Sequence, residues 1–262
     1  MQTHFLKFPK RFLVFLFFAV ISVKCVAQDS YEIQVYGSEP TEKGKTMLEF
    51  HTNFTANGNK AIENGVVPSH HSLHESIELT HGFSSWFEIG LYLFTSASPS
   101  DGYSWVGNHI RPRFSIPKSW NWPVGLSLSN EFGYIQRSYS ADTWDWELRP
   151  IIDKTFFDKL YVSFNPTLEK SLKGVNINQG FLFSPNFKMS YRTISKAAFG
   201  VEYYGVLGPL HQFDTYQNQE HQIVPCVDLY LSPDWEFNMG AMFGVTNVTD
   251  KLVFKLIVGR RF

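Results

Sequence analysis

Apolar and polar residues alternate along most of the chain. Near its end, Phe237, Met239 and Ala241 are separated by Asn238 and Gly240. Successive side chains of a strand point to opposite faces, so this period of two predicts strands with one apolar and one polar face. The chain after its N-terminal region is therefore expected to be all-β.

The same alternation predicts twelve strands, each of about ten residues, which is the length that a tilted membrane-spanning strand needs. The expected strands cover residues 45–54, 69–81, 85–95, 104–117, 123–135, 143–154, 159–169, 180–192, 197–207, 220–231, 234–245 and 251–262.

Short and long connections alternate between these strands. The short ones are residues 81–85, 117–122, 155–158, 193–196 and 232–234, and the longer ones are residues 56–68, 96–103, 138–142, 171–179 and 208–219. Outer-membrane barrels have short periplasmic turns and longer outer loops, whereas a soluble β-sandwich has no reason to sort its loops by length. The pattern predicts a closed antiparallel transmembrane β-barrel of about twelve strands.

Aromatic residues gather at both ends of the expected strands. Those near the short turns are Phe83, Trp86, Trp120, Trp122, Phe156, Phe157, Tyr191 and Trp235, and those near the longer loops are Tyr103, Trp105, Tyr139, Trp144 and Trp146. Two such belts suit the two interfaces of a membrane. The terminal Phe262 resembles the signal that the barrel assembly machinery reads in Gram-negative bacteria. We therefore expect a bacterial outer-membrane location, with lipid, lipopolysaccharide and this machinery as partners.

The first residues have the layout of a secretory signal. A basic start precedes an apolar run over residues 12–23, and small residues follow up to Ala27. The run is short for a membrane-spanning helix, so residues 1–27 are expected to be a cleaved signal peptide. Residues 28–44 are then a periplasmic segment or a lumen plug, and residues 45–262 are the barrel.

Charge and composition narrow the class further. Without residues 1–27 the chain has 19 basic and 24 acidic residues, since four of its 23 Lys and Arg are removed. No basic patch is present, so nucleic acid is not an expected partner. Aromatic residues make up 17% of the chain at a mean hydropathy of −0.17. That combination fits a wall that is apolar on one side only.

If the apolar face points outward, a polar set points inward. An Arg or Lys facing lipid at mid-membrane would cost about 2–4 kcal/mol, which favours the inward placement. The lumen-lining candidates for binding or selectivity are Glu49, His51, Glu78, Glu88, His109, Arg111, Arg113, Glu131, Glu147, Arg149, Lys188, Glu202, Glu236 and Lys255. The alternative is that these charges only pair with each other, because twelve strands lie between filled eight-stranded barrels and open sixteen-stranded porins.

Two features depart from the pattern. Glu75 shares the outward parity of Leu73 and Ile77, which places it at headgroup depth or after a bulge that resets parity. Five prolines also fall inside expected strands on the outward parity: Pro112, Pro150, Pro166, Pro185 and Pro225. A strand proline removes a ladder donor. The prolines therefore mark bulges or non-bonded positions, or a weakened wall through which an apolar solute leaves sideways.

Candidate chemistry is sparse. His70 and His74 share one strand face, while His71 and His81 share the other, so they do not converge as metal ligands must. The segment around His51 lacks the serine that an outer-membrane phospholipase needs, because Asn53 occupies its place. No phosphate-binding or dinucleotide motif is present. No metal, cofactor or enzymatic activity is expected.

Several segments carry a resemblance to a known group. They are residues 33–39 (IQVYGSE), 47–53 (MLEFHTN), 78–82 (ELTHG), 244–246 (GVT) and 259–262 (GRRF). The chain resembles bacterial outer-membrane barrels that are grouped with transporters of the phenol meta-cleavage pathway. This resemblance implies passive passage of small, aromatic or hydrophobic solutes. Two alternatives stay open: a sealed barrel that interacts through its outer loops, and a lipid-modifying enzyme.

Overall fold

The computed structural model describes residues 30–262. The signal peptide expected over residues 1–27 lies outside the described residues. Within residues 30–262, no helix is long and apolar enough to cross a membrane.

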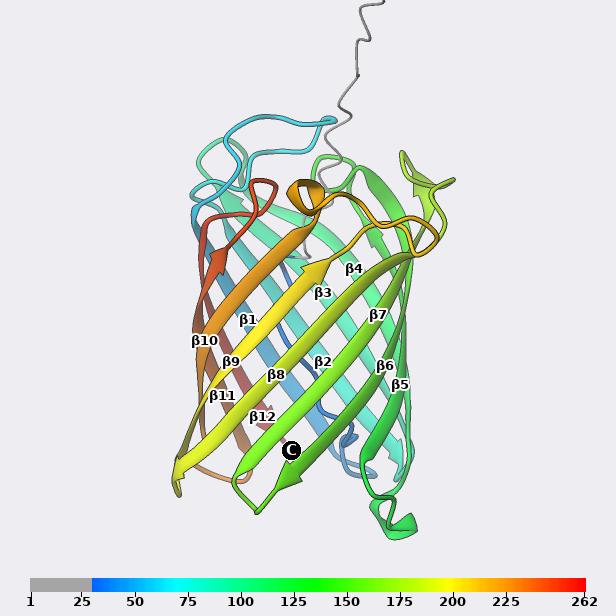
Figure 1. Cartoon of the computed structure of the whole chain (residues 1–262), viewed down its shortest axis with the longest axis vertical. Coiled ribbons are helices and arrows are strands. Elements are labelled where there is room, and N and C mark those ends of the chain that lie inside the picture. Colours follow the sequence, from blue (N-terminus) through cyan, green and yellow to red (C-terminus); the bar gives the residue numbers. More distant parts are fainter. Residues whose placement is uncertain (1–29) are drawn as a thin grey trace, which may run out of the picture.

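Twelve antiparallel strands close into a barrel (Figure 1). Each strand pairs with its neighbours in sequence, and the last strand pairs with the first, so the barrel has no free edge. The strands are β1 (Thr46–Asn57), β2 (Leu73–Ser84), β3 (Phe87–Ser98), β4 (Gly102–Ser115), β5 (Gly125–Ile135), β6 (Asp142–Phe156), β7 (Leu160–Gly174), β8 (Leu182–Ile194), β9 (Ala197–Val206), β10 (Glu220–Leu229), β11 (Trp235–Gly244) and β12 (Leu252–Arg261). Two short 3₁₀ turns, η1 (Lys118–Trp120) and η2 (Tyr216–Asn218), lie in connections. The predicted fold class is confirmed.

Strand boundaries differ from the prediction mainly at the long-loop end. β2 begins at Leu73 rather than at residue 69, because the chain turns at His71, which has a positive φ of 60°. In contrast, β3 continues to Ser98 and β7 to Gly174, beyond the predicted ends. Polar residues there still pair with the neighbouring strand, so the ladder extends past the apolar stretch.

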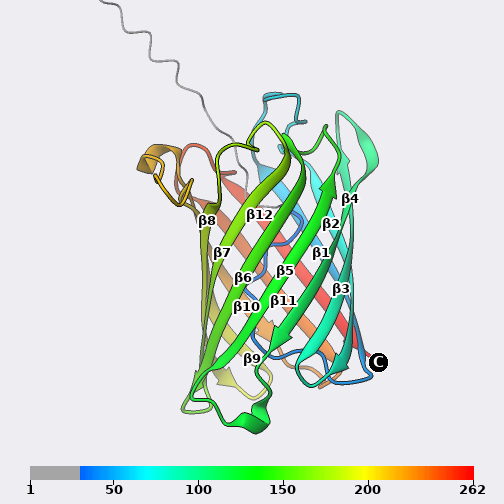
Figure 2. The same ribbon diagram turned by 90° about the vertical axis from the view of Figure 1, so that its right-hand side faces the viewer.

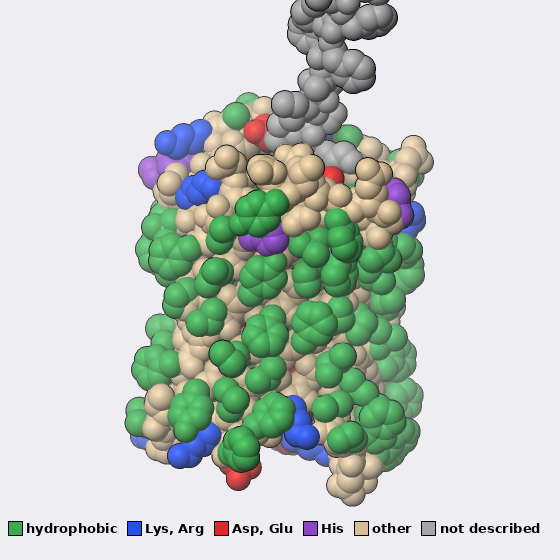
Figure 3. Space-filling view, viewed as in Figure 1, with side chains coloured by type: hydrophobic (Ala, Val, Ile, Leu, Met, Phe, Trp, Pro, Cys, Tyr) green, Lys and Arg blue, Asp and Glu red, His purple; other side chains and the backbone are tan. Residues whose placement is uncertain are grey.

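The two faces of the wall separate as the alternation predicts. Phe50 and Phe54 of β1 are 47% and 40% exposed, whereas His51 and Asn53 between them are each 1% exposed. Hydrophobic side chains cover the outer surface between the two polar ends (Figure 3). The closed ladder and this apolar surface together satisfy what a bilayer requires of a spanning sheet.

Glu75 lies on the outward face, and the two ladders of β2 have no bulge at its position. It pairs with Thr52 and Thr95 in continuous register, and the Thr95 hydroxyl donates a hydrogen bond to its carboxylate at 3.3 Å. Its position near the loop end of β2 places it toward the polar rim, which is the first of the two expected explanations.

Four of the five strand prolines lie at gaps in the ladder rather than in bulges, and the fifth, Pro185, pairs with Pro166 in the continuous β7–β8 ladder. Pairing between β6 and β7 stops after Leu148–Leu168 and resumes at Ile152–Phe164 in the same register, on either side of Pro150 and Pro166. Similar gaps surround Pro112 between β4 and β5 and Pro225 between β10 and β11. A proline cannot donate to a neighbour, so the wall loses bonds at these sites without changing direction.

Residues 30–44 run through the interior of the barrel (Figures 1 and 2). At one end of this segment the Asn53 amide donates a hydrogen bond to the Ser30 carbonyl oxygen at 2.8 Å. At the other end Lys43 forms an isolated β-bridge with Gly82, near the turn end of β2. Residues 31–36 alternate between apolar and polar as a strand does, but they do not join the sheet. Residues 30–44 therefore occupy the lumen, and we call this segment the plug.

Candidate functional site

The inward charges form three groups along the wall. The first lies on β2, β3 and β4, where Arg111 forms an ion pair with Glu78 and lies 3.4 Å from Glu88. Arg113 also pairs with Glu88, at 2.6 Å. All four side chains are nearly inaccessible to solvent, so neither sign is left without a counter-charge.

The second group joins β8, β9, β10 and β12. Glu202 is shared by Lys255 at 2.5 Å and Lys188 at 3.3 Å, and Lys188 also pairs with Asp228 at 2.7 Å. The Tyr204 hydroxyl donates to Glu202 at 2.8 Å. In this group two ammonium groups and two carboxylates from four strands pair with one another.

The third group lies on β4, β5 and β6, closer to the long loops. His109 is 2.6 Å from Glu131, and Arg149 is 2.6 Å from Glu147. Of the remaining predicted lumen residues, two lie beside the first group and one lies at the turn end. Glu49 on β1 is buried and pairs with Glu78 on β2, and His51 lies 3.8 Å from the Glu78 carboxylate. Glu236 is half-exposed at the turn end and pairs with Arg261 at 3.0 Å.

The plug is held by side chains from several strands. The backbone N–H of Tyr36 donates to Asn165 at 2.8 Å, and the Ser163 hydroxyl donates to the Tyr36 carbonyl at 2.7 Å. The guanidinium groups of Arg111 and Arg149 lie 5.1 and 4.6 Å from the Tyr36 ring centre. Tyr36 therefore docks beside the β6–β7 gap and between two buried cations.

Backbone carbonyls of the plug accept further bonds. Arg113 donates to the carbonyls of Gly37 and Glu39, each at 2.9 Å, and Lys255 donates to that of Ile33 at 2.9 Å. The Thr41 N–H donates to Glu88 at 2.5 Å. The inward charges thus have a second role, because they satisfy polar backbone that the interior would otherwise leave unpaired.

The sequence interpretation missed an apolar patch on the inner face. Ile33 and Val35 of the plug pack against inward residues of β9 to β12, namely Tyr204, Val224, Cys226, Met242 and Val253. Apolar residues on both faces of these strands were the signal that something apolar covers them from inside. Cys226 is buried and unpaired within the described residues.

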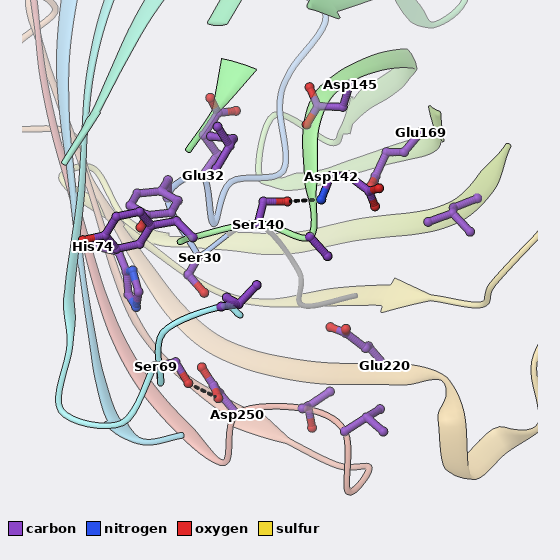
Figure 4. A pocket seen from close by; sticks show the side chains of 18 of the residues that line it. Ser30, Glu32, Ser69, His74, Ser140, Asp142, Asp145, Glu169, Glu220 and Asp250 are labelled. Carbon is purple, nitrogen blue, oxygen red and sulfur yellow. Dashed lines mark hydrogen bonds between the residues drawn. The ribbon is translucent and has the colours of Figure 1, made fainter. Parts of the chain in front are cut away.

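A cavity of about 660 Å³ opens above the plug at the long-loop end (Figure 4). Its floor includes Ser30, Glu32 and Gln34 of the plug, and its sides are the upper strands and loops. We call this cavity the vestibule. Its volume is in the range that small-molecule pockets occupy.

The loops around the vestibule are tied together at Asp250. Its carboxylate accepts hydrogen bonds from the Ser69 hydroxyl at 2.7 Å and from the Asn59 N–H at 3.0 Å. Burial raises the pKa of this carboxyl above its ordinary value, while the two hydrogen bonds oppose that rise. The β1–β2 loop is thereby fixed to the β11–β12 loop.

The histidines around β2 do not form a metal site. His70 and His71 stack at 3.9 Å in the turn before the strand, whereas His74 points inward. Among residues 30–262, no three His, Cys, Asp or Glu side chains are grouped so that they could hold a metal ion.

No protein-family model matches the chain, and no curated protein does. Solved structures are similar to it in fold. An outer-membrane channel from Pseudomonas putida F1 has a TM-score of 0.58 at 12% identity, over 88% of this chain and 100% of that one. The KdgM porin has a TM-score of 0.54 at 9% identity, over 82% and 99%. The NanC porin has a TM-score of 0.53 at 7% identity, over 82% and 97%.

These similarities concern the fold alone, and they agree with the closed ladder, the apolar outer surface and the polar lumen. Together these features define the class: the chain is a twelve-stranded outer-membrane β-barrel. The location expected from the sequence follows from this class.

Proposed function

We propose that this barrel is a passive channel for small solutes, entered through the vestibule and narrowed by the plug. The observation that carries the proposal is that the vestibule reaches down to the third group of inward charges, because Glu131, Glu147 and Arg149 line it. The plug crosses the lumen as a single extended segment held by polar contacts, which is a smaller obstacle than a folded domain.

We further propose that the solutes are small and aromatic or hydrophobic. The resemblance to transporters of the phenol meta-cleavage pathway implies this class. An apolar cluster beside the vestibule supports it: Tyr31 packs with Phe94 and Ile135, and Tyr139 lies against them. Among the similar structures, one holds the KdgM porin in complex with disordered oligogalacturonate, which is a property of that protein.

A solute in the vestibule would have two routes onward under this proposal. One follows the lumen past the plug to the periplasmic end. The other leads sideways through the gap between β6 and β7, where Pro150 and Pro166 remove backbone bonds. The second route suits an apolar solute, because such a solute is more stable in the bilayer than in water.

Lipid, lipopolysaccharide and the barrel assembly machinery are proposed as partners of the wall. Exposed aromatic residues at both ends support the lipid contacts, among them Trp120 and Trp122 at the turn end and Trp105 and Trp144 at the loop end. Phe262 is exposed directly after β12, where the assembly machinery would meet it.

The test is single-channel conductance of refolded, heat-modifiable protein in a planar bilayer. Discrete open steps would support a continuous aqueous path. A silent bilayer from folded protein would contradict the lumen route. The lateral route is tested with liposomes that take up a hydrophobic dye.

The alternative function is a sealed barrel that acts through its loops. It predicts no permeability and loss of function when residues 58–69 or 210–218 are shortened. No observation on the described residues favours lipid hydrolysis. His51 lies 3.8 Å from Glu78, but the neighbouring inward residue Asn53 provides no nucleophile.

A further inference from the structure

The vestibule is strongly acidic although the molecule as a whole is nearly neutral. Among residues 30–262, nine carboxyl side chains line it, against three side chains from Lys and Arg, an excess of six acidic groups. Figure 4 shows that the carboxylates come from opposite sides, with Glu32, Asp145 and Glu169 facing Glu220 and Asp250.

The three cations at the vestibule are already engaged. Arg149 pairs with Glu147 at 2.6 Å, and Lys251 donates to the Thr246 carbonyl. The Lys170 ammonium lies 5.6 Å from the ring centre of Phe181. Deeper in the lumen the charges of both signs also pair with each other. The negative excess is therefore concentrated at the vestibule.

Buried polar atoms in the vestibule wall have no partner within residues 30–262. Gln222 on β10 is 3% exposed and Asn186 on β8 is 6% exposed, and both line the vestibule. The side-chain oxygens of both lack a hydrogen-bond donor. Neither ring nitrogen of His74, which is 7% exposed, has a partner. A buried acceptor without a donor is costly, so these oxygens favour a ligand that donates.

The remaining wall is apolar and aromatic. Tyr31, Ile135 and Tyr139 line the vestibule and belong to the cluster around Phe94. Aromatic faces attract organic cations as well as apolar groups. The wall thus offers an apolar contact, hydrogen-bond acceptors and negative charge within one cavity of about 660 Å³.

We infer that the vestibule binds small organic cations, in which an amino group is attached to an aromatic or apolar body. The inference rests on the proposed channel function and names its solute class. The ammonium group lies among the carboxylates and donates to Gln222 or Asn186, and the apolar body packs against Tyr31 and Ile135. Rings of Asp and Glu select cations in other pores by the same electrostatics.

Three probes of one shape and different charge test this inference: benzylamine, benzyl alcohol and benzoate. Their binding to the folded, detergent-solubilised protein is measured by isothermal titration calorimetry at pH 7.5 and low salt. We expect benzylamine to bind at least about tenfold more tightly than benzoate, and the difference to shrink as salt is added. Equal affinities for all three probes would overturn the inference.

Charge variants locate the effect. The double variant Glu169→Gln and Glu220→Gln should reduce the preference for benzylamine severalfold. The matched control is Asp158→Asn with Asp234→Asn, which removes two carboxylates at the turn end. It should leave the preference for benzylamine unchanged. Equal effects of the two pairs would mean that net charge, rather than the vestibule, sets the preference. The three-probe comparison on the unaltered protein stands even if a variant fails to fold.

A neutral variant separates hydrogen bonding from packing. Gln222→Leu removes an acceptor and adds apolar surface. We expect it to weaken benzylamine binding about tenfold or more, the effect of one hydrogen bond to a charged donor. Stronger binding would show a pocket that is merely apolar and would overturn the assigned role of the acceptor.

Uptake of the same probes into liposomes distinguishes this inference from the channel proposal. Selective binding of benzylamine without uptake of any probe would keep the vestibule site and overturn the channel. Uptake of all three at equal rates, with equal binding, would keep the channel and overturn the cation site. If the protein neither binds nor takes up any probe, both the cation site and the channel are overturned.

Discussion

Tyr36 contacts the barrel at more points than its neighbours in the plug. Its backbone bonds to Asn165 on β7, its ring lies near Arg111 on β4 and Arg149 on β6, and its hydroxyl is 3.3 Å from that of Tyr92 on β3. Each desolvated cation–π contact contributes about 2 kcal/mol. One residue of the plug therefore contacts four strands.

Replacing Tyr36 tests whether these contacts hold the plug in the lumen. Tyr36→Ala removes the ring and should raise single-channel conductance, or the frequency of large open steps, because the plug loses its contacts with both arginines. Tyr36→Phe keeps the ring and should resemble the unaltered protein. Identical traces for Ala and Phe would contradict this role of the ring.

Glu202 is the second residue with a large expected effect. It is 1% exposed and is the shared counter-charge of Lys188 and Lys255. Glu202→Gln leaves two buried ammonium groups with less compensation, which should destabilise the barrel by about 3–5 kcal/mol. Urea unfolding of the refolded protein measures this.

A matched control for that experiment is Glu75→Gln, which changes an outward carboxylate near the loop end. It should alter stability by less than about 1 kcal/mol, as for exposed charges in general. A loss for Glu202→Gln no larger than for the control would mean that the buried group contributes no net stability.

Among the strand pairs, β6 and β7 have the longest interruption of their ladder, over residues 149–151. Their ladder is interrupted over the positions of Pro150 and Pro166, and Pro166 also faces Pro185 on β8. The inner side of this gap is covered by the plug, where Asn165 and Ser163 bind Tyr36. The interrupted part of the β6–β7 ladder thus lies beside Tyr36, the plug residue with the most contacts to the wall.

Restoring backbone donors tests the lateral route. Pro150→Val with Pro166→Val restores backbone donors on both sides of the gap between β6 and β7, and it should slow the transfer of a hydrophobic dye into liposomes if solutes leave there. Pro233→Val, in a turn outside the ladder, is the control. Unchanged transfer in the double variant would exclude this exit.

At the scale of the whole molecule, the plug and the wall are separable. The twelve strands close on each other without any strand from residues 30–44, which contribute only an isolated bridge at Lys43. Yet buried charges of the wall, such as Arg113 and Lys255, bond to plug carbonyls. Without the plug these groups would face water in a wider lumen.

Deleting residues 30–40 should therefore leave a folded barrel with a larger conductance. Heat-modifiable migration checks the fold, and planar-bilayer recording checks the lumen. A folded variant with unchanged conductance would show that another part of the chain sets the narrowest point. A variant that no longer folds would show that the plug is needed for the wall.

The barrel itself could be predicted from local patterns. Alternation predicts which side chains of a strand face lipid, as Phe50 does, and which face the lumen, as His51 does. The loop lengths predict which end of the barrel is periplasmic and which is extracellular. The boundaries of β2 and β7 were less accurate, because backbone pairing with a neighbour can continue or stop where side-chain hydropathy gives no signal.

The alternating pattern therefore determined the class, the strand number and the inward set of charges. Only the tertiary structure decided which of these charges meet, for example that Glu202 lies between Lys188 and Lys255 from other strands. It also decided that residues 30–44 fill the lumen and that the vestibule above them is acidic. Strand parity is a property of neighbouring residues, whereas these contacts depend on closure and register, which bring together residues far apart in the chain.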